Sequence, residues 1–288
     1  MTPQAGAPPR AARATSAGAP VGIFDGGIGS YDMVGRIREA FPRQDIIYLA
    51  DRASFPYGAL TEDELLVSVT RATEGLVRLG AGSVILASNA PSVTVLDRLQ
   101  ERANVPVLGV KPPVAAALGA VAPGAVVAVA GAGVMIDSEA LGHHIAAEAL
   151  RAGTDPGRVV PVRADALIAL VESGAFLTPE RVAGPVGEFV EALRREHPRL
   201  AAITLSSTHL PWLAAEFARV APDVQLFDPA DEVVREFAAL VPQPEAAGDL
   251  VGGHLTCVAT ASAKHTLAEF QAMIDTLGLG IRPTLITL

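Results

Sequence analysis

Two short stretches of this sequence place side chains that could move protons at the ends of apolar runs. The stretch ASNAPS puts Ser88 and Asn89 after one such run, and LSSTHLP puts Ser207, Thr208 and His209 after another. Because side chains two residues apart on an extended segment share a face, Ser207 and His209 could act together in proton transfer. A capping role for Ser207 or Thr208 is the competing interpretation. The two endings together predict two walls of one site.

The loop after the first apolar run is rich in glycine. The stretch FDGGIGS sets Asp25, Gly26, Gly27 and Gly29 between an expected strand and an expected helix, where backbone amides can approach an anion. The sequence lacks both the G-x-G-x-x-G spacing of a dinucleotide site here and the Gly-Lys-Ser/Thr of a P-loop. We therefore expect any anion at this loop to be a carboxylate rather than a pyrophosphate.

A second loop, DRASFPYG, follows the next apolar run. Its Pro56, Tyr57 and Gly58 predict a fixed turn. Tyr57 either hydrogen-bonds a ligand or packs against the protein, and the sequence leaves both interpretations open. Each strand-end residue taken singly is an ordinary turn or cap residue, but the set favours a site.

The composition excludes several classes of function. Hydrophobic residues make up 50% of the 288 residues, yet no apolar run approaches the roughly 20 residues that span a bilayer. The net charge of -9 argues against a nucleic-acid partner, because phosphate binding needs clustered Lys and Arg. The single cysteine, Cys257, allows no internal disulfide and no metal-ligand spacing. We expect neither a membrane nor a metal partner.

The first 20 residues are rich in Ala, Pro, Gly and Arg and lack the apolar centre of a secretory signal. They predict a disordered tail at 1–20 and a cytoplasmic protein.

Short apolar runs alternate with helical patterns along the chain, which predicts βαβ units and parallel sheets with helices on both faces. Ligands of such sheets bind beyond the carboxyl ends of the strands, where the polar residues above lie. The expected strands are VGIF, DIIYLA, SVILAS and VPVLGV in a first series, then GAVVAVAG, RVVPVRA, LAAITLS and DVQLFD in a second. The expected helices are 30–40, 61–79, 92–102, 112–120, 137–152, 178–195 and 231–240.

In order and spacing, these motifs resemble the aspartate/glutamate racemase superfamily, and within it the glutamate racemases. FDGGIGS is similar to the family's Phe-Asp-Ser-Gly-x-Gly, DRASFPYG to its Asp-x-x-x-x-Pro-Tyr-Gly, ASNAPS to Ala-Cys-Asn-Thr-Ala-Ser, and LSSTHLP to Gly-Cys-Thr-His-Tyr-Pro. The resemblance covers about residues 21–270.

The resemblance implies a fold of two pseudo-symmetric α/β domains that face each other across a central cleft. The first domain would comprise 21–114 plus 225–288, and the second 115–224. The resemblance also implies catalysis without a cofactor or metal, a small carboxylate or amino acid as ligand, and a homodimer.

In the family, two cysteines stand on opposite faces of the substrate's α-carbon, one as thiolate base and one as thiol acid. The matching positions here hold Ser88 and Ser207. By the same match, Asp25 would assist Ser88 and His209 would assist Ser207. The substrate-binding positions carried over from the resemblance are Gly26, Pro56, Tyr57, Gly58, Asn89, Ala90, Gly131, Ala132 and Thr208.

The loss of both thiols has a large energetic consequence. The pKa of a thiol is near 8.5, and that of a hydroxyl is nearer 15.7. A difference of only five pKa units already makes the anion of the hydroxyl roughly 7 kcal/mol more costly to form than that of the thiol. Family hydroxyls are also missing at Gly26, Ala90 and Ala132, and a family Glu is Pro112 here. Two hypotheses follow. The protein is an isomerase, racemase or related decarboxylase or lyase with altered chemistry or substrate, or an inactive homologue that binds a small carboxylate.

Overall fold

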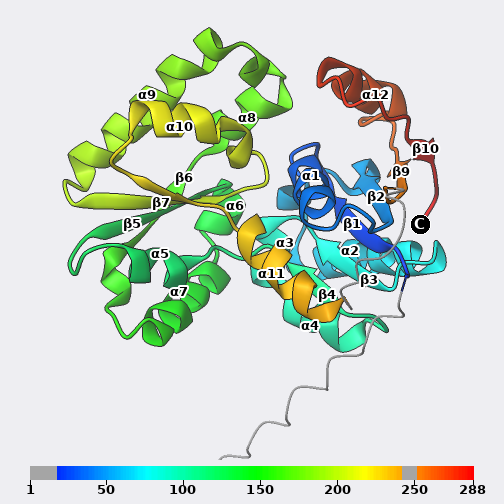
Figure 1. The fold of residues 1–288 in the computed structure, drawn as a ribbon, viewed down its shortest axis with the longest axis horizontal. Coiled ribbons are helices and arrows are strands. Elements are labelled where there is room, and N and C mark those ends of the chain that lie inside the picture. Colours follow the sequence, from blue (N-terminus) through cyan, green and yellow to red (C-terminus); the bar gives the residue numbers. More distant parts are fainter. Residues whose placement is uncertain (1–17, 242–251) are drawn as a thin grey trace, which may run out of the picture.

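The computed structural model describes residues 18–241 and 252–288, so positions 1–17 of the expected N-terminal tail lie outside the described residues. The chain forms two parallel β-sheets, each flanked by helices, and the two bodies lie side by side (Figure 1). This arrangement confirms the expected α/β class with two parallel sheets.

The first sheet has six strands in the order β10-β9-β2-β1-β3-β4. Every neighbouring pair in it is parallel. The strands are β1 (Val21–Asp25), β2 (Ile46–Asp51), β3 (Ser83–Leu86), β4 (Val107–Gly109), β9 (Leu255–Thr260) and β10 (Thr284–Leu285).

The second sheet has four parallel strands in the order β6-β5-β7-β8. They are β5 (Val126–Gly131), β6 (Val159–Arg163), β7 (Leu200–Ser206) and β8 (Gln225–Phe227). The order β6-β5-β7-β8 repeats the order β2-β1-β3-β4 of the first sheet, so the two halves share one strand topology.

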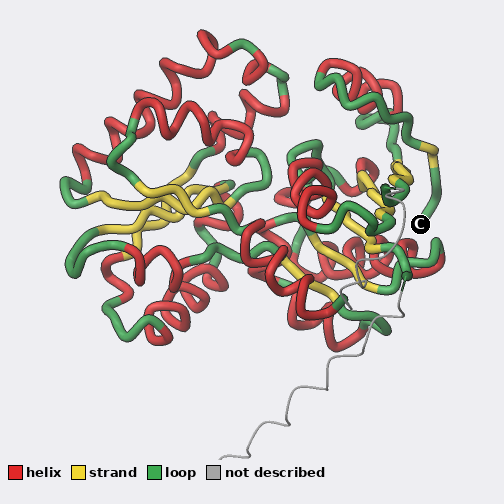
Figure 2. Tube along the Cα trace, viewed as in Figure 1, coloured by secondary structure: helices red, strands yellow, loops and turns green. Residues whose placement is uncertain are grey.

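Helices cover both faces of each sheet, as the layers in Figure 2 show. The helices are α1 (Tyr31–Ala40), α2 (Glu62–Arg78), α3 (Asn89–Thr94), α4 (Leu96–Arg102), α5 (Val114–Ala120), α6 (Gly133–Ile136), α7 (Glu139–Arg151), α8 (Asp165–Glu172), α9 (Pro179–Glu196), α10 (Ala214–Val220), α11 (Ala230–Leu240) and α12 (Leu267–Thr276). Short 3-10 turns lie at Arg52–Ser54, Tyr57–Ala59, Pro156–Arg158, Ala175–Leu177 and Leu210–Leu213.

The apolar runs of the strands explain why both faces are covered. Successive side chains of a strand point to opposite faces. In β1, Ile23 joins the core on one face and Phe24 the core on the other. In β5, Ala128 and Val129 divide between two cores in the same way. A strand that is apolar at every position must be buried on both sides, which is typical of parallel sheets.

The structure differs from the expected domain division at β8. Residues 225–227, assigned to the first domain, pair with β7 in the second sheet. The next helix, α11, does return to the first domain, because Val233 and Phe237 pack in the core that contains β1. The chain therefore crosses back between 227 and 230, and the division into domains otherwise stays a prediction.

Two helices differ from expectation in ways that affect the strand ends. The expected helix 92–102 is split at Val95, and its first part, α3, already begins at Asn89. Asn89 and Ala90 thus lie in the first turn of a helix, directly after Ser88. In addition, no helix was expected at 165–172, where the structure has α8.

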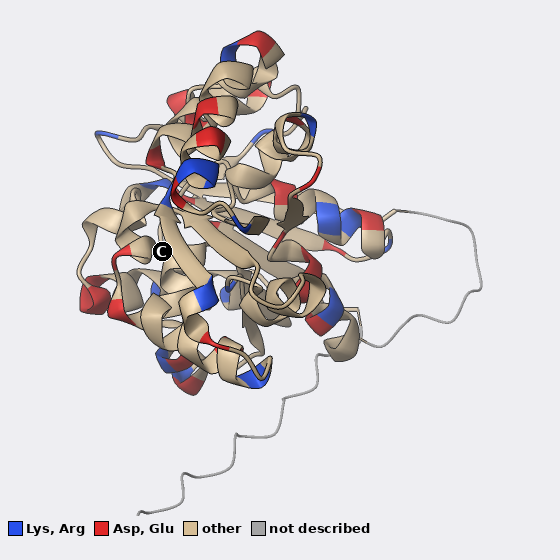
Figure 3. Cartoon of the chain, turned by 90° about the vertical axis from the view of Figure 1, so that its left-hand side faces the viewer, with Lys and Arg blue, Asp and Glu red and all other residues tan. Residues whose placement is uncertain are grey.

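No helix within 18–241 and 252–288 combines the length and apolar character that crossing a membrane requires. Acidic and basic residues are interspersed along the surface helices in the view of Figure 3.

Candidate active site

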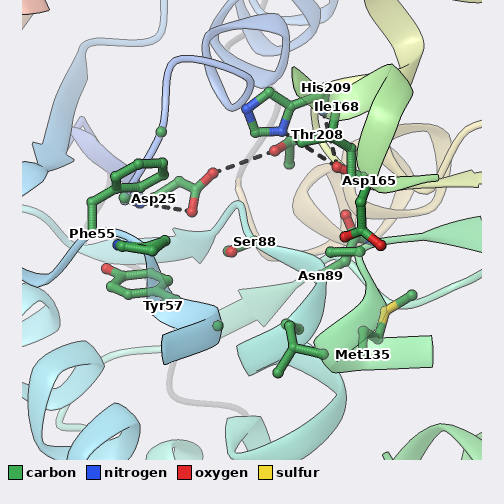
Figure 4. A pocket seen from close by; sticks show the side chains of 18 of the residues that line it. Asp25, Phe55, Tyr57, Ser88, Asn89, Met135, Asp165, Ile168, Thr208 and His209 are labelled. Carbon is green, nitrogen blue, oxygen red and sulfur yellow. Dashed lines mark hydrogen bonds between the residues drawn. The ribbon is translucent and has the colours of Figure 1, made fainter. Parts of the chain in front are cut away.

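The carboxyl ends of the two sheets meet at a cavity of about 390 Å³. The first domain contributes residues that follow β1, β2 and β3, and the second contributes residues that follow β5, β6 and β7. Twelve of the positions proposed from the sequence line this cavity: Asp25, Gly26, Pro56, Tyr57, Gly58, Ser88, Asn89, Ala90, Ala132, Ser207, Thr208 and His209. Figure 4 shows Asp25, Ser88, Asn89 and His209 around the same space.

Asp25 ends β1 and is 5% exposed. One carboxylate oxygen accepts a hydrogen bond from the Gly26 backbone N–H at 2.7 Å. The other accepts from the hydroxyl of Thr208, in the second domain, at 3.3 Å (Figure 4). Burial raises the pKa of Asp25 to about 6, against the opposing effects of the His209 charge and of hydrogen bonds from Ser88 and Gly26. Asp25 can therefore accept or release a proton near neutral pH.

His209 is 8% exposed and lies directly before the 3-10 turn that follows β7. Its Nδ1 lies 3.3 Å from Ser207 Oγ, and its Nε2 lies 2.6 Å from Glu172 Oε1. The expected pairing of Ser207 with His209 is thus present in the structure. Glu172, at the end of α8, adds a carboxylate to the pair.

The pKa of Glu172 reflects opposing effects. Burial acts to raise it, but the hydrogen bond with His209, the charges of His209 and Arg52, and a backbone hydrogen bond from Ile28 bring it below its usual value. Glu172 therefore stays ionised at neutral pH and holds the imidazole through a charge-assisted hydrogen bond.

The glycine-rich loop after β1 allows Glu172 and His209 of the second domain to approach its backbone closely. A Cβ atom at Gly27 would lie 2.6 Å from Glu172 Oε1, and one at Gly29 would lie 2.9 Å from the His209 ring. We expected a carboxylate against this loop, and the carboxylate that lies there is the protein's own Glu172. The loop thus positions the His209–Glu172 pair.

Ser88 and Asn89 form the third side of the cavity. Ser88 is half-buried at the junction of β3 and α3, and its hydroxyl bonds to Asp25. Asn89 is buried, and its side-chain amide donates to the Val110 carbonyl at 3.0 Å. This bond fixes the start of α3 and with it the position of Ser88.

The neighbours Phe55 and Arg52 explain why position 26 has no side chain. A Cβ atom at Gly26 would lie 3.2 Å from the Phe55 ring. The Arg52 guanidinium lies over that ring at 4.4 Å from its centroid and donates to the Gly26 carbonyl at 2.9 Å. A serine side chain at position 26 would therefore crowd Phe55, so Gly26 and Phe55 fit together as a set.

Tyr57 has its hydroxyl occupied within the protein. The hydroxyl donates to Asp51 Oδ2 at 3.1 Å, and Asp51 also accepts from Thr260 at 2.8 Å. Of the two interpretations of Tyr57, the structure supports packing, since its buried ring forms part of the cavity wall.

Gly131 is the one proposed position that does not line the cavity. It ends β5 beneath the wall, where a Cβ atom would lie 2.5 Å from Met135 and 2.8 Å from the Ser206 carbonyl oxygen. Its role is to allow this close packing of β5 and β7.

Sequence reasoning missed several lining residues, above all Glu172. The others are Phe55, Val134, Met135, Asp165 and Ile168. Gly27 and Ser206 also line the cavity, and they belong to the stretches FDGGIGS and LSSTHLP considered above. The apolar spacing of Leu167, Ile168 and Val171 is a helix signal that could have located α8. Nothing in the sequence pairs Glu172 with His209, which lies 37 positions away.

The cavity is acidic. Its wall includes the carboxylates of Asp25, Asp165 and Glu172, and no Lys or Arg from the described ranges. Within those ranges, too, no group of three His, Cys, Asp or Glu side chains is placed to hold a metal ion. The charge of the wall favours a ligand with an ammonium group.

Trp212 links the two domains. Its indole N–H donates to the Gly29 carbonyl at 3.1 Å, and its ring packs edge-on against Phe176. We expect Trp212→Phe to lower the free energy of unfolding by about 1 kcal/mol, because the ring contact survives while the hydrogen bond is lost. Urea unfolding followed by circular dichroism would measure this. An unchanged midpoint would show that the bond adds nothing to stability.

The model of the Asp/Glu/Hydantoin racemase family matches residues 28–237 of the chain. A glutamate racemase of Deinococcus radiodurans is 30% identical over 265 residues, which cover 91% of this chain and 87% of that protein.

Solved structures of similar fold include the glutamate racemase of Thermus thermophilus in complex with β-chloro-D-alanine. It superposes with a TM-score of 0.69 at 25% identity, covering 94% of this chain and 97% of that one. The glutamate racemase RacE1 of Bacillus anthracis superposes with a TM-score of 0.74 at 21% identity, covering 94% and 97%.

Proposed function

Since the chain belongs to the Asp/Glu/Hydantoin racemase family, we propose that it exchanges the α-proton of a small amino acid without a cofactor. The observation that carries this proposal is the pair of hydroxyls in the cavity, one from each domain, each bonded to a titratable side chain. Ser88 is bonded to Asp25 and Ser207 to His209.

The two pairs support proton transfer without a free alkoxide. On one face, Ser88 Oγ takes the α-proton while its own proton passes to Asp25. On the other face, Ser207 gives its proton to the carbanion and takes one from His209. Because each hydroxyl gains a proton as it loses one, the roughly 7 kcal/mol cost of ionising a hydroxyl instead of a thiol is largely avoided.

The acidic wall supports an amino acid as substrate. The α-ammonium group of an amino acid would be attracted by Asp25, Asp165 and Glu172. The related Thermus thermophilus protein binds β-chloro-D-alanine, an amino acid. We assign two side chains to the substrate carboxylate. Asn89 has a second amide N–H beside the one that donates to Val110, and the Thr208 hydroxyl would turn from Asp25 to the ligand.

The proposal is tested by proton NMR in heavy water with the purified full-length protein. L- and D-glutamate, L- and D-aspartate and several malonate-type and hydroxy acids would each be followed for loss of the α-proton signal. We expect exchange with at least one amino acid.

We expect His209→Gln to slow this exchange by about 100-fold, because the imidazole that supplies a proton to Ser207 is lost. His143→Gln, at an exposed position on α7, is the matched control and should exchange like the starting protein. Equal rates in the two variants would rule out the role of His209.

A binding protein without turnover is the second candidate, because by the resemblance both thiols are absent. In that case an amino acid should raise the melting temperature through mass action, while no α-proton is lost. Product formation that disappears in Ser207→Ala would exclude it. The homodimer and the cytoplasmic location stay predictions.

A further inference from the structure

Three side chains of the cavity form a chain of hydroxyl, imidazole and carboxylate. Ser207 Oγ lies 3.3 Å from His209 Nδ1, and His209 Nε2 lies 2.6 Å from Glu172 Oε1. All three line the cavity, and Ser207 is 7% exposed. A nucleophile, a base and a group that orients the base occur in this order in enzymes that transfer acyl groups.

The hydrogen bonds define the imidazole tautomer needed for such a role. Glu172 is ionised and accepts from Nε2–H, so in the uncharged imidazole Nδ1 carries the lone pair that faces Ser207. The exchange proposed above starts instead from the imidazolium, whose Nδ1 carries a proton. Glu172 is itself held by the backbone N–H of Ile28 and lies against Gly27. The imidazole is therefore held from behind and free to accept the Ser207 proton.

A serine hydroxyl with a basic neighbour is suited to acyl transfer. A hydroxyl that works alone would have to ionise first, which serine does not do near neutral pH. In acyl transfer the proton passes to the imidazole while the new bond forms, so no free alkoxide is needed. Serine at position 207 is thus matched to the His209–Glu172 pair.

We propose that Ser207 is an acyl-accepting nucleophile, and that the cavity cleaves small esters or thioesters through an acyl-serine intermediate. This activity is additional to the α-proton exchange proposed above and does not depend on it.

The reaction balances with water as the only co-reactant. Ser207 Oγ bonds to the acyl carbon as its proton moves to His209 Nδ1, and the bond to the leaving oxygen or sulfur breaks as that proton passes to it. Water then attacks the acyl carbon as one of its protons moves to Nδ1. The bond between Ser207 Oγ and the acyl carbon breaks, the acid leaves, and the proton on Nδ1 returns to Ser207 Oγ.

The cavity wall indicates the class of acyl group. Phe55 and Tyr57 from the first domain and Met135 and Ile168 from the second give the cavity an apolar part of its wall (Figure 4). Val134 also lines the cavity. The carboxylates of the wall disfavour a negative charge on the substrate. A short, uncharged acyl group fits this wall.

Ser88 is the other cavity hydroxyl, but its environment differs. Its hydrogen-bond partner is the carboxyl of Asp25. His209 is the one histidine among the described residues of the wall, and it contacts Ser207. We therefore assign the nucleophile to Ser207.

The test uses the purified full-length protein and two probes, p-nitrophenyl acetate and an uncharged alkyl fluorophosphonate. In the second case Oγ–P forms, P–F breaks and fluoride leaves. Intact-protein mass spectrometry and peptide mapping would locate the adduct. We expect turnover of p-nitrophenyl acetate with release of p-nitrophenolate. From the fluorophosphonate we expect one adduct per chain on Ser207, none on Ser207→Ala, and labelling at least about 100-fold slower in His209→Gln.

Ser68→Ala, at a position on α2 outside the cavity wall, is the matched control and should label like the starting protein. Circular dichroism and melting temperature would show that Ser207→Ala is folded. No adduct, an adduct on Ser88 or a lysine, or undiminished labelling of folded Ser207→Ala would each overturn the proposal. The heavy-water experiment needs no acyl donor, so the two activities can fail separately.

Discussion

Cysteine at both position 88 and position 207 is expected to raise the rate of α-proton exchange by at least about 100-fold. A thiol ionises near pKa 8.5, so forming the base costs roughly 7 kcal/mol less than with a hydroxyl. The neighbours that would assist a thiolate are already in place, since Asp25 bonds to Ser88 and His209 to Ser207. The double variant Ser88→Cys and Ser207→Cys therefore tests whether both positions face the α-carbon.

The measurement is the heavy-water exchange with both enantiomers of glutamate and aspartate. Each single variant, with one thiol, should exchange one enantiomer faster than the other, because it can remove the proton efficiently from one face only. Ser68→Cys controls for a thiol outside the cavity. A folded double variant with no exchange of any acid would show that these positions do not flank a substrate α-carbon.

Asp25→Asn is expected to reduce exchange by about 100- to 10,000-fold, because an amide cannot accept the proton that Ser88 relays. For the same reason, the exchange rate of the protein that carries Asp25 should increase as the pH rises through about 6, where the buried Asp25 carboxyl loses its proton. The variant should lose this dependence. If exchange by the starting protein is too slow to measure, the effect of Asp25→Asn can be measured in the double-cysteine variant.

The same substitution should stabilise the protein at pH 8. Burial raises the pKa of Asp25 from 3.8 to about 6, so the folded state binds the proton more tightly than the unfolded state. This contribution to stability is complete below about pH 4 and is lost as the pH rises through about 6. Two pKa units correspond to at most about 3 kcal/mol.

Urea unfolding at pH 4 and pH 8 measures this effect. Asp25→Asn should be more stable than the starting protein at pH 8, and the difference should shrink toward pH 4. Asp63→Asn is the control, because the Asp63 side chain is 85% exposed and pairs with Arg98 at the surface. A loss of stability at pH 8 would contradict the assignment of an ionised, desolvated carboxylate to Asp25.

The two activities inferred for the cavity share one constraint, which is that its hydroxyls act only together with a titratable neighbour. Asp25 serves the first-domain side, and the His209–Glu172 pair serves the other. The loss of function in His209→Gln should therefore appear in both exchange and acylation. The Asp25→Asn variant should affect exchange alone.

The sequence by itself determined the α/β class and most of the cavity wall. Apolar runs of strand length require burial on both faces, which only parallel sheets covered by helices supply. In parallel sheets the ends of the strands gather at one edge, so strand order and strand ends suffice to place Asp25, Ser88 and Ser207 in one site. Ser207 and His209 are two residues apart, and local geometry alone brings them together.

Only the tertiary structure decided how the domains complete each other. Glu172 reaches His209 because it lies at the end of α8 against Gly27 and the Ile28 backbone of the glycine-rich loop, and such a contact has no local sequence signal. Three further features also have no local sequence signal. They are the hydrogen bond of the Tyr57 hydroxyl to Asp51, the pairing of β8 in the second sheet, and the place of Gly131 beneath the cavity wall. Periodicity and turn residues act over a few positions, whereas these contacts depend on the packing of segments far apart in the chain.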